Sequence, residues 1–381
     1  MSASSSRAAE EVLLSAALRG AHDVWRDLRE PGQPARFLDA AARHRVRPLL
    51  AWQLRERGEL AGWPNSLRNG LLSAERAEAA IEIVRRAELC RLLRAFEAQG
   101  IPVLLLKGAA FAYSLYPEPW LRPRQDTDLL IRPGDVDSAA GLLDRAGYVP
   151  TPAVSGQLVA HQRNYVRPAG ERFRHDCDLH WKACNPVSIA DVLPSETLLQ
   201  TAGAASLGDG QVARIARADH ALLLACLHRA SHHHDSRDLL WLYDIHLLAE
   251  RLTGREIDEL IETARRTGSG AVCARGLRLA VGCFETRLPS SSLLTDLETS
   301  SEHGRGLPTV YLRSNVRKAD LLLADLGAIP GWRGWVRLLK EHLFPPADYM
   351  LAGFRRSSRL WLPVLYAWRI ARGARGWFRP L

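Results

Sequence analysis

Two aspartates, Asp126 and Asp128, lie two positions apart at the start of a short apolar stretch that continues through residues 129–131. If this stretch is a β-strand, both carboxylates point to the same face, because side chains alternate along a strand. Carboxylates on one face repel each other unless a cation neutralises them, and magnesium is a hard, oxygen-preferring ion that suits such a pair. The two aspartates are therefore the first candidates for a metal-binding site.

A glycine precedes Asp126 by eighteen positions: Gly108 follows Lys107 at the end of the apolar run 102–106. Glycine lets a backbone approach phosphate oxygens closely, and the N–H groups at a helix start favour anions. Lys107 would add a positive charge, and Arg124, just upstream of the aspartates, would supply a further contact. We therefore expect Lys107, Gly108 and Arg124 to bind phosphate groups.

Further acidic residues follow in residues 174–181, which the alternation of apolar side chains predicts to be another strand. Asp176, Asp178 and His180 share one face there, so the pattern alone does not choose between the two carboxylates. A carboxylate from a neighbouring strand would complete a metal site or take the proton of an acceptor hydroxyl. His180 is either an active-site residue on the acceptor side or a hydrogen-bonded structural residue.

The elements that must position these residues fall into three segments. Residues 1–100 have helical periodicity, most clearly over residues 71–99. Residues 101–186 alternate short apolar strands with helices, and helical periodicity then returns over residues 187–381, with a loop predicted at 290–308. We predict an α+β fold in which a small mixed β-sheet forms a core flanked by helical N-terminal and C-terminal lobes.

The order of these features resembles the polymerase-beta-like nucleotidyltransferase superfamily, in which a glycine at a strand-to-helix turn precedes a strand with paired carboxylates. More closely, five short landmarks between residues 37 and 372 are similar to those of an uncharacterised bacterial nucleotidyltransferase family. The landmarks are Leu105-Leu106-Lys107-Gly108, Arg124-Gln125-Asp126-Thr127-Asp128-Leu129-Leu130, Asp178-Leu179-His180-Trp181, Trp241-Leu242-Tyr243-Asp244 and Leu343-Phe344-Pro345-Pro346.

This resemblance implies a magnesium-dependent enzyme that moves a nucleoside monophosphate from a nucleoside triphosphate to an acceptor hydroxyl and releases pyrophosphate. Asp126, Asp128 and Asp178 would then be catalytic and would bind two Mg²⁺ ions, with Asp178 chosen over Asp176. The expected acceptor is a small molecule, a peptide or a protein; nucleic acid is less favoured. One departure is Ala109, because the superfamily usually has Gly-Ser or Gly-Gly at this turn. Because degenerate members of such folds persist as binding modules, a catalytically inactive nucleotide- or partner-binding module on the same fold is the alternative.

A histidine cluster allows a weaker alternative. The cluster consists of His228, His232, His233, His234 and Asp235. His228 and His232, one turn apart on a helix, can bind a transition metal, and His234-Asp235 resembles the motif of phosphohydrolases of the His-Asp type. The other interpretation is a polar helix end or a patch near the substrate cleft.

Asp244 also has two interpretations. It either pairs with an arginine in the core of the C-terminal lobe or contributes to acceptor binding.

The net charge of +9 is concentrated at one end of the chain. Residues 351–381 contain no acidic residue and seven arginines, which are Arg355, Arg356, Arg359, Arg369, Arg372, Arg375 and Arg379. Tryptophans and aliphatic residues alternate with them, so this segment either binds an anionic membrane surface, binds RNA, or packs its aromatic side chains on the body of the protein.

The cysteines, the N-terminus and the lengths of the apolar runs indicate the cellular compartment. The six cysteines form no CxxC pair, no signal peptide is visible at the N-terminus, and no apolar run reaches the length of a membrane span. We therefore expect a cytoplasmic protein with free, buried thiols.

Overall fold

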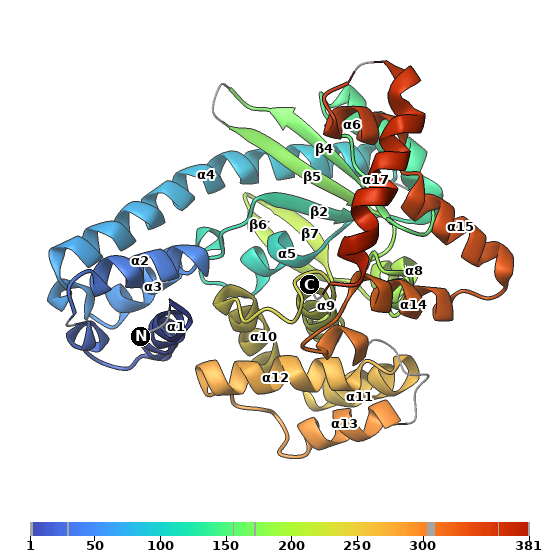
Figure 1. Cartoon of the computed structure of the whole chain (residues 1–381). Helices are drawn as coiled ribbons and strands as arrows, with labels where there is room; N and C mark the ends of the chain where they lie inside the picture. Colours follow the sequence, from blue (N-terminus) through green and yellow to red (C-terminus); the bar gives the residue numbers. More distant parts are fainter. Residues whose placement is uncertain are drawn as a thin grey trace.

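The computed structural model describes residues 3–28, 30–154, 156–170, 173–302, 309–356 and 358–379. Within them, a mixed seven-stranded sheet forms the centre and helices cover both of its sides (Figure 1). The predicted α+β class with helical lobes before and after the sheet is confirmed. The last two residues of the arginine-rich segment, 380 and 381, lie outside the described residues.

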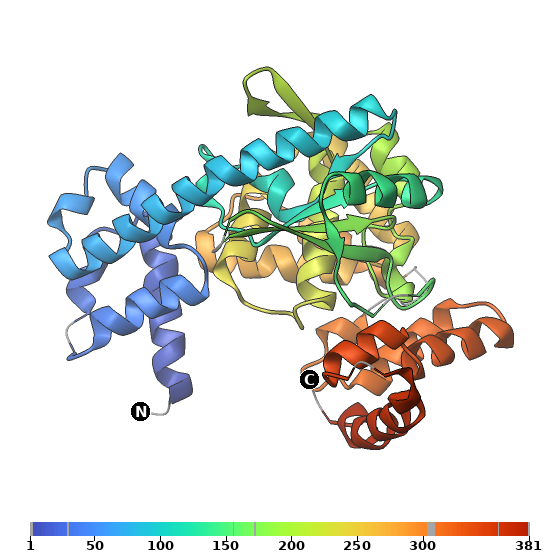
Figure 2. The same cartoon turned by 90° about the horizontal axis from the view of Figure 1, so that it is seen from above.

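Four helices precede the sheet. They are α1 (Ala3–Arg19), α2 (Gln33–Arg43), α3 (Arg47–Glu56) and α4 (Asn65–Ala98). Helix α4 leaves the bundle of α1–α3 and extends along the sheet (Figures 1 and 2). Its side chains reach both halves of the sheet, because Arg86 pairs with Asp209 in one hairpin and Glu88 pairs with Arg167 in another strand. Gly100, in a left-handed conformation with φ of 67°, follows the end of this helix.

The central segment supplies five strands. Its elements are β1 (Leu104–Leu105), α5 (Lys107–Ser114), β2 (Asp126–Leu130), α6 (Val136–Arg145), β3 (Val149–Pro150), β4 (Gln162–Pro168) and β5 (Arg174–His180). Residues 129–131 and Leu179 are fully buried, so the apolar ends of β2 and β5 hold these strands in the interior. Strands β4 and β5 pair as an antiparallel hairpin, whereas β2 and β5 pair in parallel.

The sheet does not end at residue 186, which corrects the predicted boundary of the central segment. After α7 (Val187–Ala190) and α8 (Ser195–Gln200), the hairpin β6 (Gly203–Gly208) and β7 (Gln211–Ile215) joins the sheet through a parallel pairing of β7 with β1. The strand order is β3-β4-β5-β2-β1-β7-β6. Gly208 and Gly210, both with positive φ, and Asp209 between them form the turn of this hairpin.

The C-terminal helices form two groups. The first is α9 (Ala218–Ser231), α10 (Leu239–Arg251), α11 (Gly254–Thr267), α12 (Gly270–Phe284) and α13 (Leu293–Glu302). The second is α14 (Lys318–Ala328), α15 (Trp332–Leu343), α16 (Ala347–Gly353) and α17 (Leu362–Trp377), which gather on the side of the molecule away from α1–α3 (Figure 2). Helix α13 replaces much of the loop predicted at 290–308, because Leu293 and Leu297, one turn apart, are fully buried; residues 303–308 lie outside the described parts.

One hydrophobic core runs through the N-terminal helices, the sheet and α9–α13, whereas α16 and α17 pack around a small separate cluster of Met350, Leu351 and Leu365. All six cysteines are buried and free, as expected. No helix in the described parts of the chain combines the length and apolar character needed to cross a bilayer.

Candidate active site

The pairing of β2 with β5 brings the predicted acidic residues together. In this parallel register Asp126 lies opposite Asp176, Asp128 opposite Asp178, and Leu130 opposite His180. Ligand atoms of Asp128, Asp178 and His180 all lie within 4.8 Å of one another. Carboxylates so close favour a cation between them. This group is the metal-binding candidate found among the described residues.

Asp128 is at the centre of the cluster. Its Oδ1 lies 2.7 Å from Nζ of Lys107 and 2.8 Å from Nε2 of His180, and its side chain is buried. Burial opposes ionisation, but the charge of Lys107 and the hydrogen bond with His180 outweigh it and hold the pKa of Asp128 far below its usual range. Asp128 is therefore a carboxylate at neutral pH.

Asp178 lies in a different environment. Its carboxylate accepts hydrogen bonds from Nε2 of Gln162 at 3.1 Å and from the amide of Asn164, both on the neighbouring strand β4. Desolvation, together with the charges of Asp128 and Asp126, raises the pKa of Asp178 to about 7. A carboxyl group with this pKa can accept and release a proton near neutral pH.

The other two aspartates, Asp126 and Asp176, lie outside the metal-binding group. Asp126 is exposed on the cavity side of β2, and desolvation and the charge of Asp128 raise its pKa. Asp176 accepts a hydrogen bond from Nε of Arg174 at 3.0 Å and does not belong to the metal-binding group. The geometry therefore favours Asp178 over Asp176 as the third carboxylate.

The turn from β1 to α5 lies next to the carboxylates. Lys107 has a left-handed φ of 47°, an uncommon conformation for a residue with a side chain. At Gly108, an added Cβ would lie 2.5 Å from Nη1 of Arg122, so only glycine leaves room for that guanidinium. Gly108 thus places the start of α5 directly beside a buried arginine.

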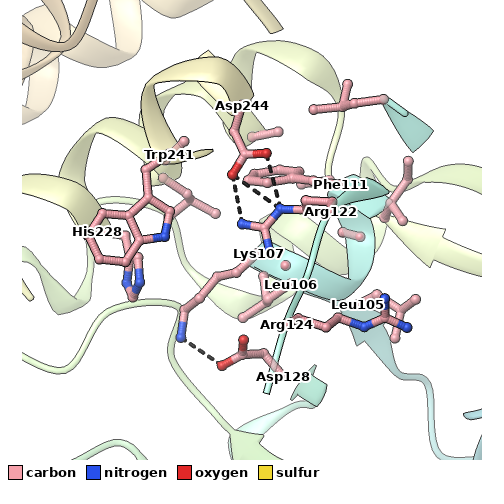
Figure 3. Close-up of a pocket in the computed structure, with 18 of the residues that line it drawn as sticks. Leu105, Leu106, Lys107, Phe111, Arg122, Arg124, Asp128, His228, Trp241 and Asp244 are labelled. Carbon is pink, nitrogen blue, oxygen red and sulfur yellow. Dashed lines mark hydrogen bonds and ion pairs between the residues drawn. The ribbon is translucent and has the colours of Figure 1, made fainter. Parts of the chain in front are cut away.

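Arg122 itself was missed by the sequence analysis. Its Nε and Nη2 donate to Asp244, the shorter contact being 2.7 Å (Figure 3), and the Tyr116 hydroxyl donates to the same carboxylate at 2.9 Å. Arg122 and Asp244 are both buried. The arginine partner expected for Asp244 therefore exists, but it comes from the segment before β2 rather than from the C-terminal lobe. Its Nη1 lies next to Gly108.

Arg124, which the sequence analysis selected, is held elsewhere. Its Nη1 and Nη2 each lie 2.8 Å from a carboxylate oxygen of Glu82 on α4, and its guanidinium lies over the ring of Tyr113. Arg124 lines the cavity, but Glu82 engages its charged end. The predicted phosphate contact through Arg124 stays a prediction, and the structure offers Arg122 as a second candidate for it.

A cavity of about 600 Å³ connects these groups. The carboxylates and Lys107 lie on one side of it. Its lining also includes His228 from α9, His232 and His233 from the turn after α9, and Trp241 from α10. Desolvation and the charge of Lys107 lower the pKa of His232 to about 3, and burial also lowers the pKa of His228. These histidines are therefore neutral at pH 7. Their place in the cavity lining agrees with the interpretation of the cluster as a patch near the cleft.

The same cluster does not assemble a His-Asp metal group among the described residues. Nε2 of His228 and Nε2 of His233 are 3.0 Å apart, and His233 stacks on Trp241. Asp235, however, is bound by Arg229 at 2.6 Å and by Arg275 at 3.0 Å. The carboxylate that a His-Asp phosphohydrolase needs is thus engaged by two arginines, which leaves that alternative without support from the geometry.

A comparison with protein-family models places the chain in a family. A family model described as an uncharacterised nucleotidyltransferase covers residues 30–285, from the loop before α2 to the end of α12. The match includes every strand of the sheet and the whole lining of the cavity. No curated protein matches the chain.

Proposed function

The chain belongs to this uncharacterised nucleotidyltransferase family, and from that premise we propose that it transfers a nucleoside monophosphate from a nucleoside triphosphate to an acceptor hydroxyl. One observation carries the proposal: Asp128 and Asp178 lie side by side on parallel strands, beside the glycine turn that opens α5. In this reaction the acceptor oxygen bonds to the α-phosphorus, the bond from that phosphorus to the bridging oxygen breaks, and pyrophosphate leaves.

The residues present fit a magnesium site. Asp126, Asp128 and Asp178 offer the carboxylate oxygens that Mg²⁺ prefers, and Lys107 at Asp128 shows that the cluster accommodates a positive charge. These three aspartates would hold the ions, of which we expect two. Bound there, magnesium would neutralise charge on the triphosphate and polarise the acceptor hydroxyl.

The protein's own groups then have separate tasks. Asp178, with its pKa near neutrality, takes the proton of the acceptor hydroxyl. Gln162 and Asn164 orient its carboxylate. Lys107, Arg122 and the N–H groups at the start of α5 bind the phosphates, which are anions. Asp244 contributes to the site by fixing the guanidinium of Arg122, and Tyr116 holds Asp244 in place through its hydroxyl.

The acceptor binds from the side of α9 and α10, where His228, His232 and Trp241 line the cavity. Neutral histidines and an indole suit an acceptor that offers hydroxyl groups and apolar surface rather than a polyanion. A small molecule, a peptide or a side chain of a protein meets this description. Nucleic acid fits less well, because residues 1–350 carry only a small share of the net charge.

Transfer of label from each α-labelled nucleoside triphosphate, with magnesium and a cell extract as the source of acceptor, tests this proposal. We expect labelled product with the wild type and none with Asp126→Asn or Asp128→Asn. Asp176→Asn is the matched control, because Asp176 lies on the same sheet face but is held by Arg174 and is not one of the three proposed magnesium ligands. The absence of transfer in the wild type, or transfer that survives both substitutions, would contradict the proposal.

The contact between Lys107 and Asp128 favours a second candidate function. An ammonium group bound to the central carboxylate can substitute for a metal ion, and the turn lacks the usual serine or glycine because Ala109 follows Gly108. The chain would then be a nucleotide-binding module without turnover. Nucleotide binding that is unchanged by a metal chelator, together with no label transfer, identifies this case.

A further inference from the structure

Helix α15 has one face that fixes it to the protein. Leu338 is fully buried, and the carboxylate of Glu341 accepts hydrogen bonds from the backbone N–H groups of residues 157–159 at 2.8–3.1 Å. Residues 157–159 precede β4, the strand whose side chains bind Asp178. The orientation of α15 on the body is therefore defined by a buried anchor.

A second face of α15 is apolar and exposed. It consists of Trp332, Trp335, Val336 and Leu339, which recur at helical spacing. Their exposed fractions are 67%, 46%, 54% and 37%. Two tryptophans and two aliphatic side chains on one unpartnered helix face are unusual for a surface that meets only water. Within the described residues, Ile329 accepts a hydrogen bond from the Trp335 indole, yet all four side chains keep more than a third of their surface exposed.

The third face of α15 is basic. Arg333, Arg337 and Lys340 are all exposed and lie beside the apolar face, because each follows an apolar residue by one position along the helix. The surrounding chain has the same character: residues 331–381 contain ten arginines and lysines and two acidic residues. One of those two, Glu341, is used by the anchor and by Arg337.

The last helix, α17, repeats this combination. Val364 and Trp368 are 59% and 46% exposed, and the guanidinium of Arg372 lies over the Trp368 ring. Leu365 is buried against α16, and the Tyr366 hydroxyl donates to the carbonyl of Pro345, so α17 is also fixed by its opposite side. The aromatic residues of the tail are thus not all packed on the body.

We propose that α15, together with α17, binds the surface of an anionic lipid membrane. Twelve residues span about 18 Å, too short to cross a bilayer, so α15 lies in the plane of the interface. Its tryptophans and aliphatic side chains enter the boundary of the acyl chains, and its cations contact anionic headgroups. This surface lies outside the segment 30–285 and does not depend on the proposed transfer reaction.

Other occupants fit less well. A second copy of the chain would bring the same excess of positive charge to the same face, so the two copies would repel each other. RNA would satisfy the arginines, but it offers nothing for Val336 and Leu339, which require an apolar environment. A bilayer with anionic headgroups supplies both an apolar layer and negative charge.

Flotation of the full chain with lipid vesicles tests the proposal. The vesicles consist of phosphatidylcholine alone or of phosphatidylcholine mixed with phosphatidylglycerol. We expect binding to the mixed vesicles, little binding to phosphatidylcholine alone, and weaker binding as salt increases. Trp332→Ser with Trp335→Ser should reduce binding at least about tenfold. Arg333→Gln with Lys340→Gln should reduce it by about fivefold per removed charge.

The matched control is Ile83→Ser with Val84→Ser, which removes two exposed apolar side chains from α4 instead of α15. Circular dichroism and thermal unfolding confirm that each variant is folded. No binding of the wild type to mixed vesicles overturns the proposal, and so does an equal loss in the control variant. Dimerisation that the α15 substitutions abolish, without vesicle binding, assigns the face to a second copy instead; binding of RNA in place of vesicles also overturns it.

Discussion

The ammonium group of Lys107 lies 2.7 Å from Oδ1 of Asp128, the same oxygen that His180 approaches to 2.8 Å. A single carboxylate oxygen thus has two partners that a bound cation would have to displace or rearrange. Lys107 supplies the positive charge that three neighbouring carboxylates need. A metal ion bound there, as we propose, would free the lysine to contact a phosphate group.

Lys107→Met should destabilise the protein in the absence of metal, because it leaves Asp128 buried beside other carboxylates without a counter-charge. We expect a loss on the order of 3 kcal/mol in the free energy of unfolding. Magnesium should then raise the melting temperature of the variant by more than it raises that of the wild type. Thermal unfolding across a magnesium titration measures both effects.

Lys182→Met is the control, since Lys182 pairs with Asp191 at the surface. It should leave stability and the response to magnesium nearly unchanged. If magnesium shifts the wild type and Lys107→Met equally, lysine and metal do not compete for Asp128.

Asp178 gives a prediction for pH. Its pKa in the folded protein is about 7, above its ordinary value of 3.8, so between roughly pH 4 and pH 7 the folded state retains a proton that the unfolded chain has released. Stability in the absence of metal should therefore fall as pH rises through this window. Asp178→Asn removes this dependence and should make the protein more stable than the wild type at pH 8, by on the order of 2 kcal/mol. Denaturant unfolding at pH 5 and pH 8 measures the difference, and parallel pH profiles would contradict it.

The sequence allowed the carboxylate cluster to be predicted because its geometry is local. Alternation along a strand places Asp126 with Asp128, and Asp178 with His180, whatever the rest of the fold does. The apolar residues that follow Asp128 also predicted from the sequence that β2 is a buried strand, and the structure has them buried. Alternation does not specify which strands are neighbours. The proximity of Asp128 to Asp178 therefore became known only from the pairing of β2 with β5 in the structure.

Features that depend on distant partners were harder to predict. The β6–β7 hairpin contains small residues with weak strand preference and is held by pairing with β1, about a hundred residues earlier. The roles of Arg122 and Arg124 depend on which acidic residue reaches each guanidinium, Asp244 or Glu82, and neither partner lies nearby in the sequence. The landmark Asp244 was the one signal that an arginine partner existed.

Arg122 and Arg124 can be compared directly, because each forms a buried pair with a carboxylate. The double variant Arg122→Gln with Asp244→Asn removes the pair beside Gly108 without leaving an isolated charge. We expect nucleoside triphosphate to bind at least about tenfold more weakly to it, since a charged donor to the phosphates is lost. Calorimetric titration with a non-hydrolysable triphosphate and magnesium measures this affinity.

The matched variant is Arg124→Gln with Glu82→Gln, which removes the pair on the α4 side. It should change the free energy of unfolding about as much as the Arg122 double variant does, because each variant removes one buried ion pair. Its affinity for the triphosphate should stay within about twofold of the wild type. Stronger weakening in this variant than in the Arg122 variant would return the phosphate contact to Arg124, where the sequence had placed it.

Gly156 gives the last prediction, because it controls how α15 is attached. A Cβ at this position would lie 2.2 Å from Oε2 of Glu341, the carboxylate that accepts hydrogen bonds from residues 157–159. Gly156→Ala should therefore displace Glu341 and cost about 2 kcal/mol of stability, as overpacking does in other proteins. Hydrogen exchange should quicken in α15 and in residues 157–159 while it stays unchanged in α4. Gly134→Ala, where an added Cβ meets no atom within 4 Å, is the control and should change neither region. Unchanged exchange in α15 of the Gly156 variant would mean that this carboxylate does not hold the helix in place.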